Sequence, residues 1–454
     1  MRKSIALLLV LVFLIASCVI MAKPASSSTD VAEDTWTAKA PMHQARGGLG
    51  VAAVNEKIYA IGGMTASGFW PVGGGLIGTN EEYDPVADKW TYKASMPTPR
   101  AFFAVGVYQN KIYCIGGEDS NGRTGVNEVY NPATDNWETK TPMPGGPSTR
   151  TPLVANVVAG KIYIIDPYSR TNYVYEPATD SWTTKTPIPN AAKAMGYASA
   201  VVDKAIYYVG VFSDSAFNLN QIYVPETDGW RFGAHTLSAV YFATAGATSG
   251  MVAPKRIYIF GTSSAVGNTA LSAPGFVNQV YDPENDSWSY GTFPPTPRID
   301  SCVVAINDTL YMIGGYTYAA LGLIAPSAVN ERYTPFGYGT VPPQISVISP
   351  ENKTYSTSNV SLAFTVNKPA VWLGYSLDGQ ETVTINGNTT IAGLTNGLHN
   401  ITVYAKDTFE NTGASETVYF SVEVPFPTTL VIAPIASVAV IGAALAIYLK
   451  KRKH

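Results

Sequence analysis

The chain is 454 residues long, which is enough for two or three domains that each have a hydrophobic core. Charged residues make up 14% of it and the formal net charge is −3, so the composition gives no support for a nucleic-acid or polyanionic partner. With only 3 cysteines and 4 histidines, the chain is poorly equipped for thiol or metal-ion catalysis, and we expect no cofactor.

Residues 1–22 have the pattern of a secretory signal peptide. Two basic residues precede an apolar run over 5–15, and small residues follow up to Ala22, where we expect cleavage. Two alternatives stay open. The tetrapeptide "IASC" resembles a bacterial lipobox with Cys18 as the lipidated residue, and the apolar run is long enough for an uncleaved anchor.

A pattern with a period near 50 residues repeats through residues 31–338. Its tryptophans are separated by 54, 47, 45, 48 and 58 residues, at Trp36, Trp90, Trp137, Trp182, Trp230 and Trp288. Periods of this size indicate propeller or solenoid units.

Each repeat has the same internal order. An apolar hairpin such as "GVAAVNEKIYAIGG" comes first, and a Tyr strand then leads through a Pro-x-x-Asp turn to the Trp strand, as in "YDPVADKW". We expect the aspartate to accept hydrogen bonds from backbone amides across that turn. Period-two alternation with frequent Gly, Pro and Thr favours four strands per repeat over helices.

The last repeat is incomplete, and the amino terminus holds the missing piece. The sixth repeat stops at "NERYTPF" without Asp-x-Trp, whereas "EDTWTAKAP" near the amino terminus has Asp-x-Trp without a Tyr strand before it. Joining the two completes a sixth sheet and closes a ring, which would otherwise leave exposed sheet edges.

These residues resemble the Kelch-repeat β-propellers. The matching features are three double glycines and a series of tyrosines, namely Gly62–Gly63, Gly116–Gly117 and Gly314–Gly315, with Tyr83, Tyr130, Tyr175, Tyr223, Tyr281 and Tyr333. Blades 1, 2 and 6 match best, and blades 3, 4 and 5 lack the double glycine. The resemblance implies an all-β fold over residues 31–338: a six-bladed Kelch β-propeller closed by the amino-terminal strand.

Residues 342–424 have a different composition, rich in Asn, Thr and alternating apolar residues. Six or seven short strands are predicted there, which suggests an antiparallel β-sandwich. The phrase "GLHNITVYAKDTFENTG" resembles immunoglobulin-like or PKD-like modules of prokaryotic, especially archaeal, surface proteins. We expect a core around Trp372 and Tyr404 and a role as a stalk.

Residues 428–449 are predicted to form one transmembrane helix. Some twenty uncharged residues match the roughly 30 Å of a bilayer core. The basic tail at 450–454 would lie in the cytoplasm and the rest of the chain outside the cell, as in a single-pass membrane protein. Asn-x-Ser/Thr sequences mark candidate glycosylation sites at Asn285, Asn307, Asn352, Asn359, Asn388 and Asn400.

The Kelch resemblance also raises two enzyme activities. A copper radical oxidase needs two Tyr and two His at one metal, but His43 and His235 stand before different blades, so we expect no metal site. Epimerisation of N-acetylneuraminate is the alternative function. Arginines that precede the first strand of a blade could then hold a sugar carboxylate around the central funnel; they are Arg46, Arg100, Arg150 and Arg298. Otherwise these arginines bond neighbouring loop carbonyls.

The long second-to-third-strand loops of blades 5, 6 and 1 are unusually apolar. They would be neighbours in a closed ring, so we predict one binding surface, formed by Phe69, Trp70, Leu76, Ile77, Phe276, Tyr316, Tyr318, Leu321, Leu323 and Ile324. The alternative is that these loops fold over one another and cap the channel. The sequence therefore favours a non-catalytic, membrane-anchored extracellular protein that binds a protein or glycan partner.

Overall fold

The computed structural model describes residues 32–67, 75–147, 152–166, 168–190, 197–213, 216–262, 275–318, 324–425 and 445. These residues form β-strands joined by turns. In this described part, no helix is long and apolar enough to cross a membrane. The predicted signal peptide and, apart from Leu445, the predicted membrane helix lie outside it.

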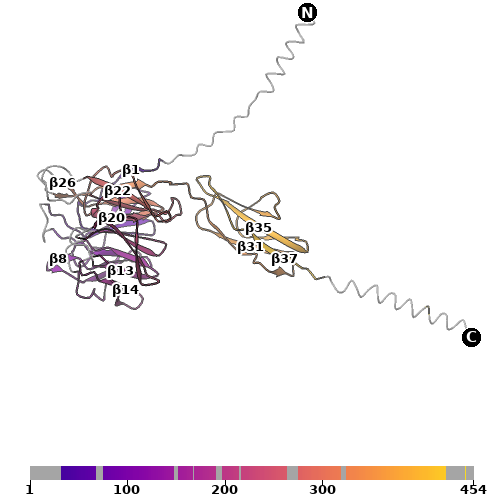
Figure 1. Ribbon diagram of the computed structural model, residues 1–454, viewed down its shortest axis with the longest axis horizontal. Helices are drawn as coiled ribbons and strands as arrows, with labels where there is room; N and C mark the ends of the chain where they lie inside the picture. Colours follow the sequence, from indigo (N-terminus) through magenta and orange to yellow (C-terminus); the bar gives the residue numbers. More distant parts are fainter. Residues whose placement is uncertain are drawn as a thin grey trace, which may run out of the picture. The chain divides into compact units, whose positions relative to one another are not determined.

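Six four-stranded antiparallel sheets, here called blades 1 to 6, follow one another along residues 35–334 (Figure 1). Blade 1 consists of β2 (Gly50–Val54), β3 (Lys57–Ile61), β4 (Asn80–Asp84) and β5 (Lys89–Lys93), and blade 2 of β6 (Ala104–Tyr108), β7 (Lys111–Ile115), β10 (Asn127–Asn131) and β11 (Asn136–Lys140). Blade 3 consists of β12 (Ala155–Val158), β13 (Lys161–Ile165), β14 (Asn172–Glu176) and β15 (Ser181–Lys185), and blade 4 of β16 (Ala198–Val202), β17 (Ala205–Ser213), β18 (Ala216–Val224) and β19 (Gly229–Gly233). Blade 5 consists of β20 (Tyr241–Ala247), β21 (Ile257–Thr262), β22 (Phe276–Asp282) and β23 (Ser287–Tyr290), and blade 6 of β24 (Cys302–Ile306), β25 (Thr309–Ile313), β28 (Asn330–Thr334) and β1 (Thr35–Lys39). Two short hairpins extend the loops: β8 (Glu118–Asp119) with β9 (Gly122–Arg123), and β26 (Tyr316–Tyr318) with β27 (Ile324–Pro326).

The first strands of the blades contact one another in a cycle. β2 contacts β6 and β24, β12 contacts β6 and β16, and β20 contacts β16 and β24. A separate hydrophobic core lies between each pair of neighbouring blades, and one of these cores joins blade 6 to blade 1. Both faces of each sheet are thereby buried, which is how a propeller avoids an exposed apolar face.

The repeated Tyr, Asp and Trp side chains join each blade to the one before it. In blade 2 the Tyr130 hydroxyl donates to Asp135 Oδ1 at 2.6 Å, and the same oxygen accepts the Ala94 amide of blade 1 at 2.9 Å. Trp137 Nε1 donates to the Ala94 carbonyl oxygen at 2.8 Å. Blade 2 thus binds both backbone groups of one residue at the end of blade 1. The residues bound in this way at the other junctions are Ala40, Thr141, Thr186, Ala234 and Thr292.

At blade 6 this set is split between the two ends of the propeller segment. Tyr333 of β28 donates to Asp34, and Trp36 of β1 donates to the Thr292 carbonyl oxygen at 2.9 Å. β1 also pairs with β28 along its whole length in antiparallel register. The predicted pairing of the amino-terminal strand with the last blade is therefore present in the structure.

The aspartate before each tryptophan does not act as predicted. In blades 1, 2 and 5 the residue after the tyrosine binds the turn amides instead; in blade 1, Asp84 Oδ1 accepts the Val86 amide at 2.9 Å. Asp88 has a left-handed backbone, with φ 51°, and its carboxylate accepts the Ala40 amide of blade 6. The sequence-based prediction placed the hydrogen bond of Asp88 inside blade 1. Its actual donor, the Ala40 amide, lies 48 residues earlier in the chain.

Residues 345–422 form two further sheets around one core. One contains β29 (Ile345–Ser349), β31 (Val360–Val366) and β34 (Thr389–Ile391). The other contains β30 (Thr354–Tyr355), β32 (Trp372–Leu377), β33 (Val383–Ile385), β35 (Gly397–Lys406), β36 (Thr412–Ala414) and β37 (Val418–Val422).

The core of this region is not built around Trp372 and Tyr404, as the sequence suggested. It contains Leu362, Ile401 and Val403, whereas Trp372 and Tyr404 are only half-buried. Successive residues of a strand face opposite sides, so the inward position of Val403 turns the neighbouring Tyr404 outward.

Candidate binding site at the channel mouth

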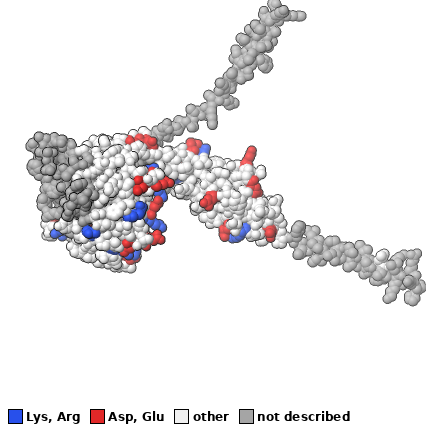
Figure 2. Space-filling view, viewed as in Figure 1, with Lys and Arg blue, Asp and Glu red and all other residues white. Residues whose placement is uncertain are grey.

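The propeller has two faces that differ in their connections. The loop face carries the connections between blades and the second-to-third-strand loops, and the turn face carries the two other sets of turns. Exposed ion pairs such as Lys111–Glu138 and Lys255–Asp203 lie at these turns. Figure 2 shows charged side chains on the side of the propeller away from β26.

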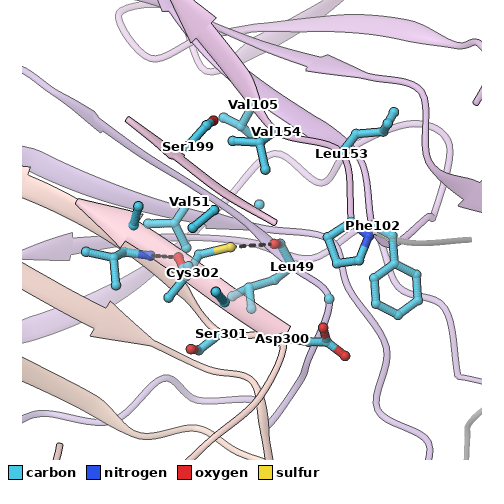
Figure 3. Close-up of a pocket in the computed structure, with 18 of the residues that line it drawn as sticks. Leu49, Val51, Phe102, Val105, Leu153, Val154, Ser199, Asp300, Ser301 and Cys302 are labelled. Carbon is cyan, nitrogen blue, oxygen red and sulfur yellow. Dashed lines mark hydrogen bonds between the residues drawn. The ribbon is translucent and has the colours of Figure 1, made fainter. Parts of the chain in front are cut away.

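The first strands of all six blades begin at the loop face and enclose a cavity of about 190 Å³ (Figure 3). Its walls combine apolar side chains with polar backbone and side-chain groups, and Leu49, Val51, Phe102, Leu153 and Phe242 are among the apolar lining residues. Several polar groups of the wall are already bonded within it. Cys302 Sγ donates to the Leu49 carbonyl oxygen at 3.0 Å, and Ser199 Oγ donates to Asn156 Oδ1 at 3.1 Å.

A chain of backbone hydrogen bonds fixes the rim of this cavity. Gly48 N donates to the Asp300 carbonyl oxygen, Phe102 N to the Gly48 carbonyl oxygen, and Leu153 N to the Phe102 carbonyl oxygen, at 3.2, 2.8 and 3.1 Å. Phe102, Phe242 and Asp300 have left-handed backbones, with φ of 59°, 49° and 48°. This conformation is strained for a bulky residue, and such strain is concentrated at functional sites.

Asp300 is the one acidic or basic residue among those described as lining the cavity. Its carboxylate has no hydrogen-bond or ion-pair partner among the described residues, and burial raises its pKa to about 7. Figure 3 shows it on the same side of the cavity as Phe102. Among the described residues, the cavity therefore combines apolar side chains with one carboxyl group that has no partner.

Beside the channel mouth, an apolar cluster joins the loops of blades 5, 6 and 1. It contains Met64, Tyr316 and Ile324, with Leu76 and Phe276 packed against it. The predicted meeting of these three loops is thus observed. Phe102 and Phe242 belong both to this cluster and to the cavity wall, so the two features form one continuous surface.

Two residues predicted for binding are in fact buried within this cluster. Tyr316 is 0% exposed and Ile324 is 3% exposed. A Cβ atom on Gly47 would lie only 2.1 Å from the Tyr316 ring, so that ring fits against bare backbone. For these two side chains the structure agrees with the alternative in which the loops fold over one another and bury their apolar residues. Leu76, Ile77 and Phe276 are half-buried, whereas Phe69, Trp70, Leu321, Leu323 and the Tyr318 side chain lie outside the described residues.

The structure does not bring the described arginines to the channel surface. Arg46, Arg100 and Arg298 are 0%, 0% and 1% exposed. Each bonds carbonyl oxygens of its own blade and pairs with a buried glutamate; these partners are Glu81, Glu128 and Glu331. The ligand-binding ring is not formed by these three, and the alternative, in which the arginines bond neighbouring carbonyl oxygens, describes the structure. Arg150 lies outside the described residues.

His43 is also held by its own blade. Its Nδ1 lies 2.6 Å from Glu81 Oε2, and its ring stacks on Tyr92 at 4.7 Å. The described part of the chain brings together no group of three or more His, Cys, Asp or Glu side chains that would suit a metal ion.

The glycosylation candidates occupy surface turns and strands. Asn285 and Asn307 lie in turns of the turn face, and both are exposed. Asn352, Asn359 and Asn388 are exposed and Asn400 is half-buried, all in the region of residues 345–422.

Sequence reasoning missed Phe102, Phe242 and Asp300. A signal for two of them exists, since Phe102 and Asp300 each stand two residues after a buried arginine, where blade 1 has Gly48. Alignment of the repeats on that arginine would have shown a bulky and an acidic residue at a position suited to glycine.

Asp300→Asn is expected to stabilise the protein at pH 8 and to leave its stability unchanged below pH 4. Because the folded-state pKa of about 7 exceeds the unfolded value, the folded state retains a proton that the unfolded state has released, and wild-type stability falls as the pH rises from 4 to 7. Three pKa units correspond to at most about 4 kcal/mol, and partial exposure should reduce this to roughly 1–3 kcal/mol. Calorimetric melting at pH 4 and pH 8 measures the effect. An equal change at both pH values would contradict it, and Asp203→Asn on the turn face is the control.

Comparisons with known proteins support a Kelch-repeat propeller. The Kelch motif matches residues 45–97 and 99–144, which form blades 1 and 2. Influenza virus NS1A-binding protein homolog B of Danio rerio is 42% identical over 84 residues, which are 18% of this chain and 12% of that protein. Kelch-like protein 36 of Bos taurus is 29% identical over 285 residues, which are 61% of this chain and 36% of that protein. The solved structure of YjhT aligns with a TM-score of 0.50 and 16% identity, covering 63% of this chain and 95% of that one, which is a likeness of fold.

Proposed function

We propose that this Kelch-repeat chain is a non-catalytic binding protein that recognises an extracellular protein or glycan through the loop face of a six-bladed propeller. The observation that carries the proposal is the continuity between the cavity and the apolar cluster beside it, through Phe102 and Phe242. A surface that combines aromatic side chains, apolar walls and a concave centre is typical of recognition sites. The name of one relative, influenza virus NS1A-binding protein homolog B, describes a binding protein, which agrees with this role.

We further propose that residues 342–424 act as an immunoglobulin-like stalk, and that residues 428–449 anchor the chain in the cell membrane after removal of residues 1–22. The chain leaves β28 on the turn face, where Gly339 N donates to the Val252 carbonyl oxygen at 2.9 Å. Both propeller glycosylation candidates lie on that face as well. This arrangement would leave the loop face free for a partner.

An exported enzyme similar to N-acetylneuraminate epimerase has less support. That activity would need arginine side chains directed into the funnel to hold a sugar carboxylate. The three described arginines point into their blades and are paired there with glutamates.

The test compares substitutions on the two faces in the full chain. Phe102→Asn removes an aromatic ring but keeps a residue that tolerates a left-handed backbone, and Leu76→Ser removes a half-buried side chain of the cluster. Val86→Ser, at a residue 95% exposed in a turn of the turn face, is the matched control. We expect the first two variants to lose at least tenfold in affinity for the glycan or protein retained by the wild type, with melting temperatures kept. Loss of binding in Val86→Ser alone would place recognition on the opposite face.

A further inference from the structure

We propose that the cavity at the channel mouth is a binding site for a primary ammonium group on an apolar stem, which would pair with Asp300. The inference rests on the proposed recognition role of the loop face and specifies the chemistry that this face accepts. The same group occurs on a lysine side chain of a partner and on a free alkylamine.

The first argument is charge. An ionised carboxylate that is partly removed from water, with no cation nearby, is costly, and a bound cation or a proton relieves that cost. Asp300 has no partner among the described residues, and no basic residue is among those described as lining the cavity. An organic monocation therefore has a large favourable interaction there, whereas an anion is excluded.

The second argument is the shape and composition of the walls. Leu49, Phe102, Leu153 and Phe242 give the cavity aliphatic and aromatic surface beside its polar groups. A methylene stem would pack against these side chains, and an aromatic ring additionally attracts a cation at its face. A small hydrated metal ion gains nothing from such walls, because it would lose its water ligands without replacing them.

The neighbouring titratable groups stay neutral and do not compete. Burial and the charge of Asp300 raise the pKa of Cys302 to about 12, and they also raise the pKa of Tyr316. The Tyr197 hydroxyl, another lining group, donates to the Ile165 carbonyl oxygen at 2.6 Å. Among the described groups around the cavity, only Asp300 changes its charge between pH 5 and pH 8.

The experiment measures binding of n-butylammonium chloride to the full chain at pH 8 by calorimetry, with n-butanol as the neutral analogue. We expect n-butylammonium to bind at least tenfold more tightly than n-butanol. Asp300→Asn should remove this difference, and Asp203→Asn should preserve it. Asp203 is a matched control because it has the same left-handed backbone, with φ 48°, and lies on the turn face.

A pH series on the wild type tests the same point without a substitution. Affinity for n-butylammonium should fall roughly tenfold or more between pH 8 and pH 5.5 as Asp300 gains its proton. A capped Gly-Lys-Gly peptide and its acetyl-lysine form distinguish the two sources. Binding of the lysine form alone indicates a side chain of a partner, and failure of both peptides beside binding of the free amine indicates a small ligand.

Equal affinity for n-butylammonium and n-butanol, or unchanged affinity in Asp300→Asn, would overturn the inference. That result leaves recognition through the loop face intact if Phe102→Asn still loses its partner. If n-butylammonium binds as expected but Phe102→Asn binds the partner as the wild type does, the ammonium site is supported. Recognition of the partner through the loop face is then contradicted.

Discussion

Deletion of residues 32–39 is expected to abolish cooperative folding of the propeller. The deletion removes β1, exposes the edge of β28 and takes Trp36 away from Phe260 and Tyr333, whose ring centroids lie 5.3 and 4.9 Å from it. The Asp34 and Trp36 bonds to Thr292 are lost at the same time. The loss should reach at least about 5 kcal/mol, which is comparable to the whole stability of many domains.

Thermal melting of the truncated chain measures this effect, and deletion of residues 23–30 is the control. A synthetic peptide of residues 32–40, added in excess, should restore the melting transition by pairing with β28. An unchanged melting temperature in the truncated chain would show that β1 contributes nothing to closure.

Arg100→Met is expected to destabilise the propeller by about 3–5 kcal/mol. Arg100 is fully buried, bonds the Gly116 and Cys114 carbonyl oxygens at 3.1 and 2.7 Å, and pairs with Glu128. Its removal leaves a buried carboxylate without a counter-charge, which costs far more than the loss of an exposed pair.

Chemical denaturation of three variants tests this assignment. Arg100→Met/Glu128→Gln should recover part of the loss because the uncompensated charge is gone. Lys111→Met breaks the Lys111–Glu138 pair of the same blade, whose side chains are 38% and 42% exposed, and should cost less than about 1 kcal/mol. Similar losses in Arg100→Met and Lys111→Met would contradict a buried structural role for Arg100.

The fold was largely predictable from the sequence because the repeat encodes the contacts between blades. Tyr, Asp and Trp recur since each blade must bind a backbone residue of its neighbour, and the incomplete last repeat pointed to the pairing of β1 with β28. Blades 1 and 2, which have the double glycines at 62–63 and 116–117, are the blades that the Kelch motif matches.

The site was less predictable because its properties depend on distant partners. Arg46 stands 35 residues before Glu81, so the sequence gives no sign that its charge is already neutralised. The sequence also did not determine which side of β35 faces the core. Tyr404 was therefore assigned to the core, where its neighbour Val403 lies instead. Asp300, like Phe102, replaces the glycine that blade 1 has at this position, and only the convergence of six blades shows that it lines a cavity.

The position of β28 inside its sheet bears on how the propeller would carry a mechanical load. Tension applied through the carboxy-terminal end of the propeller enters at Thr334, and β28 is paired on one side with β25 and on the other with β1. An interior strand cannot be peeled away one hydrogen bond at a time from a free edge, so two ladders must give way together. The weaker edge belongs to β1, which is reached from the amino terminus. Force from the carboxy-terminal side therefore meets an interior strand of the closing blade, which is paired on both sides.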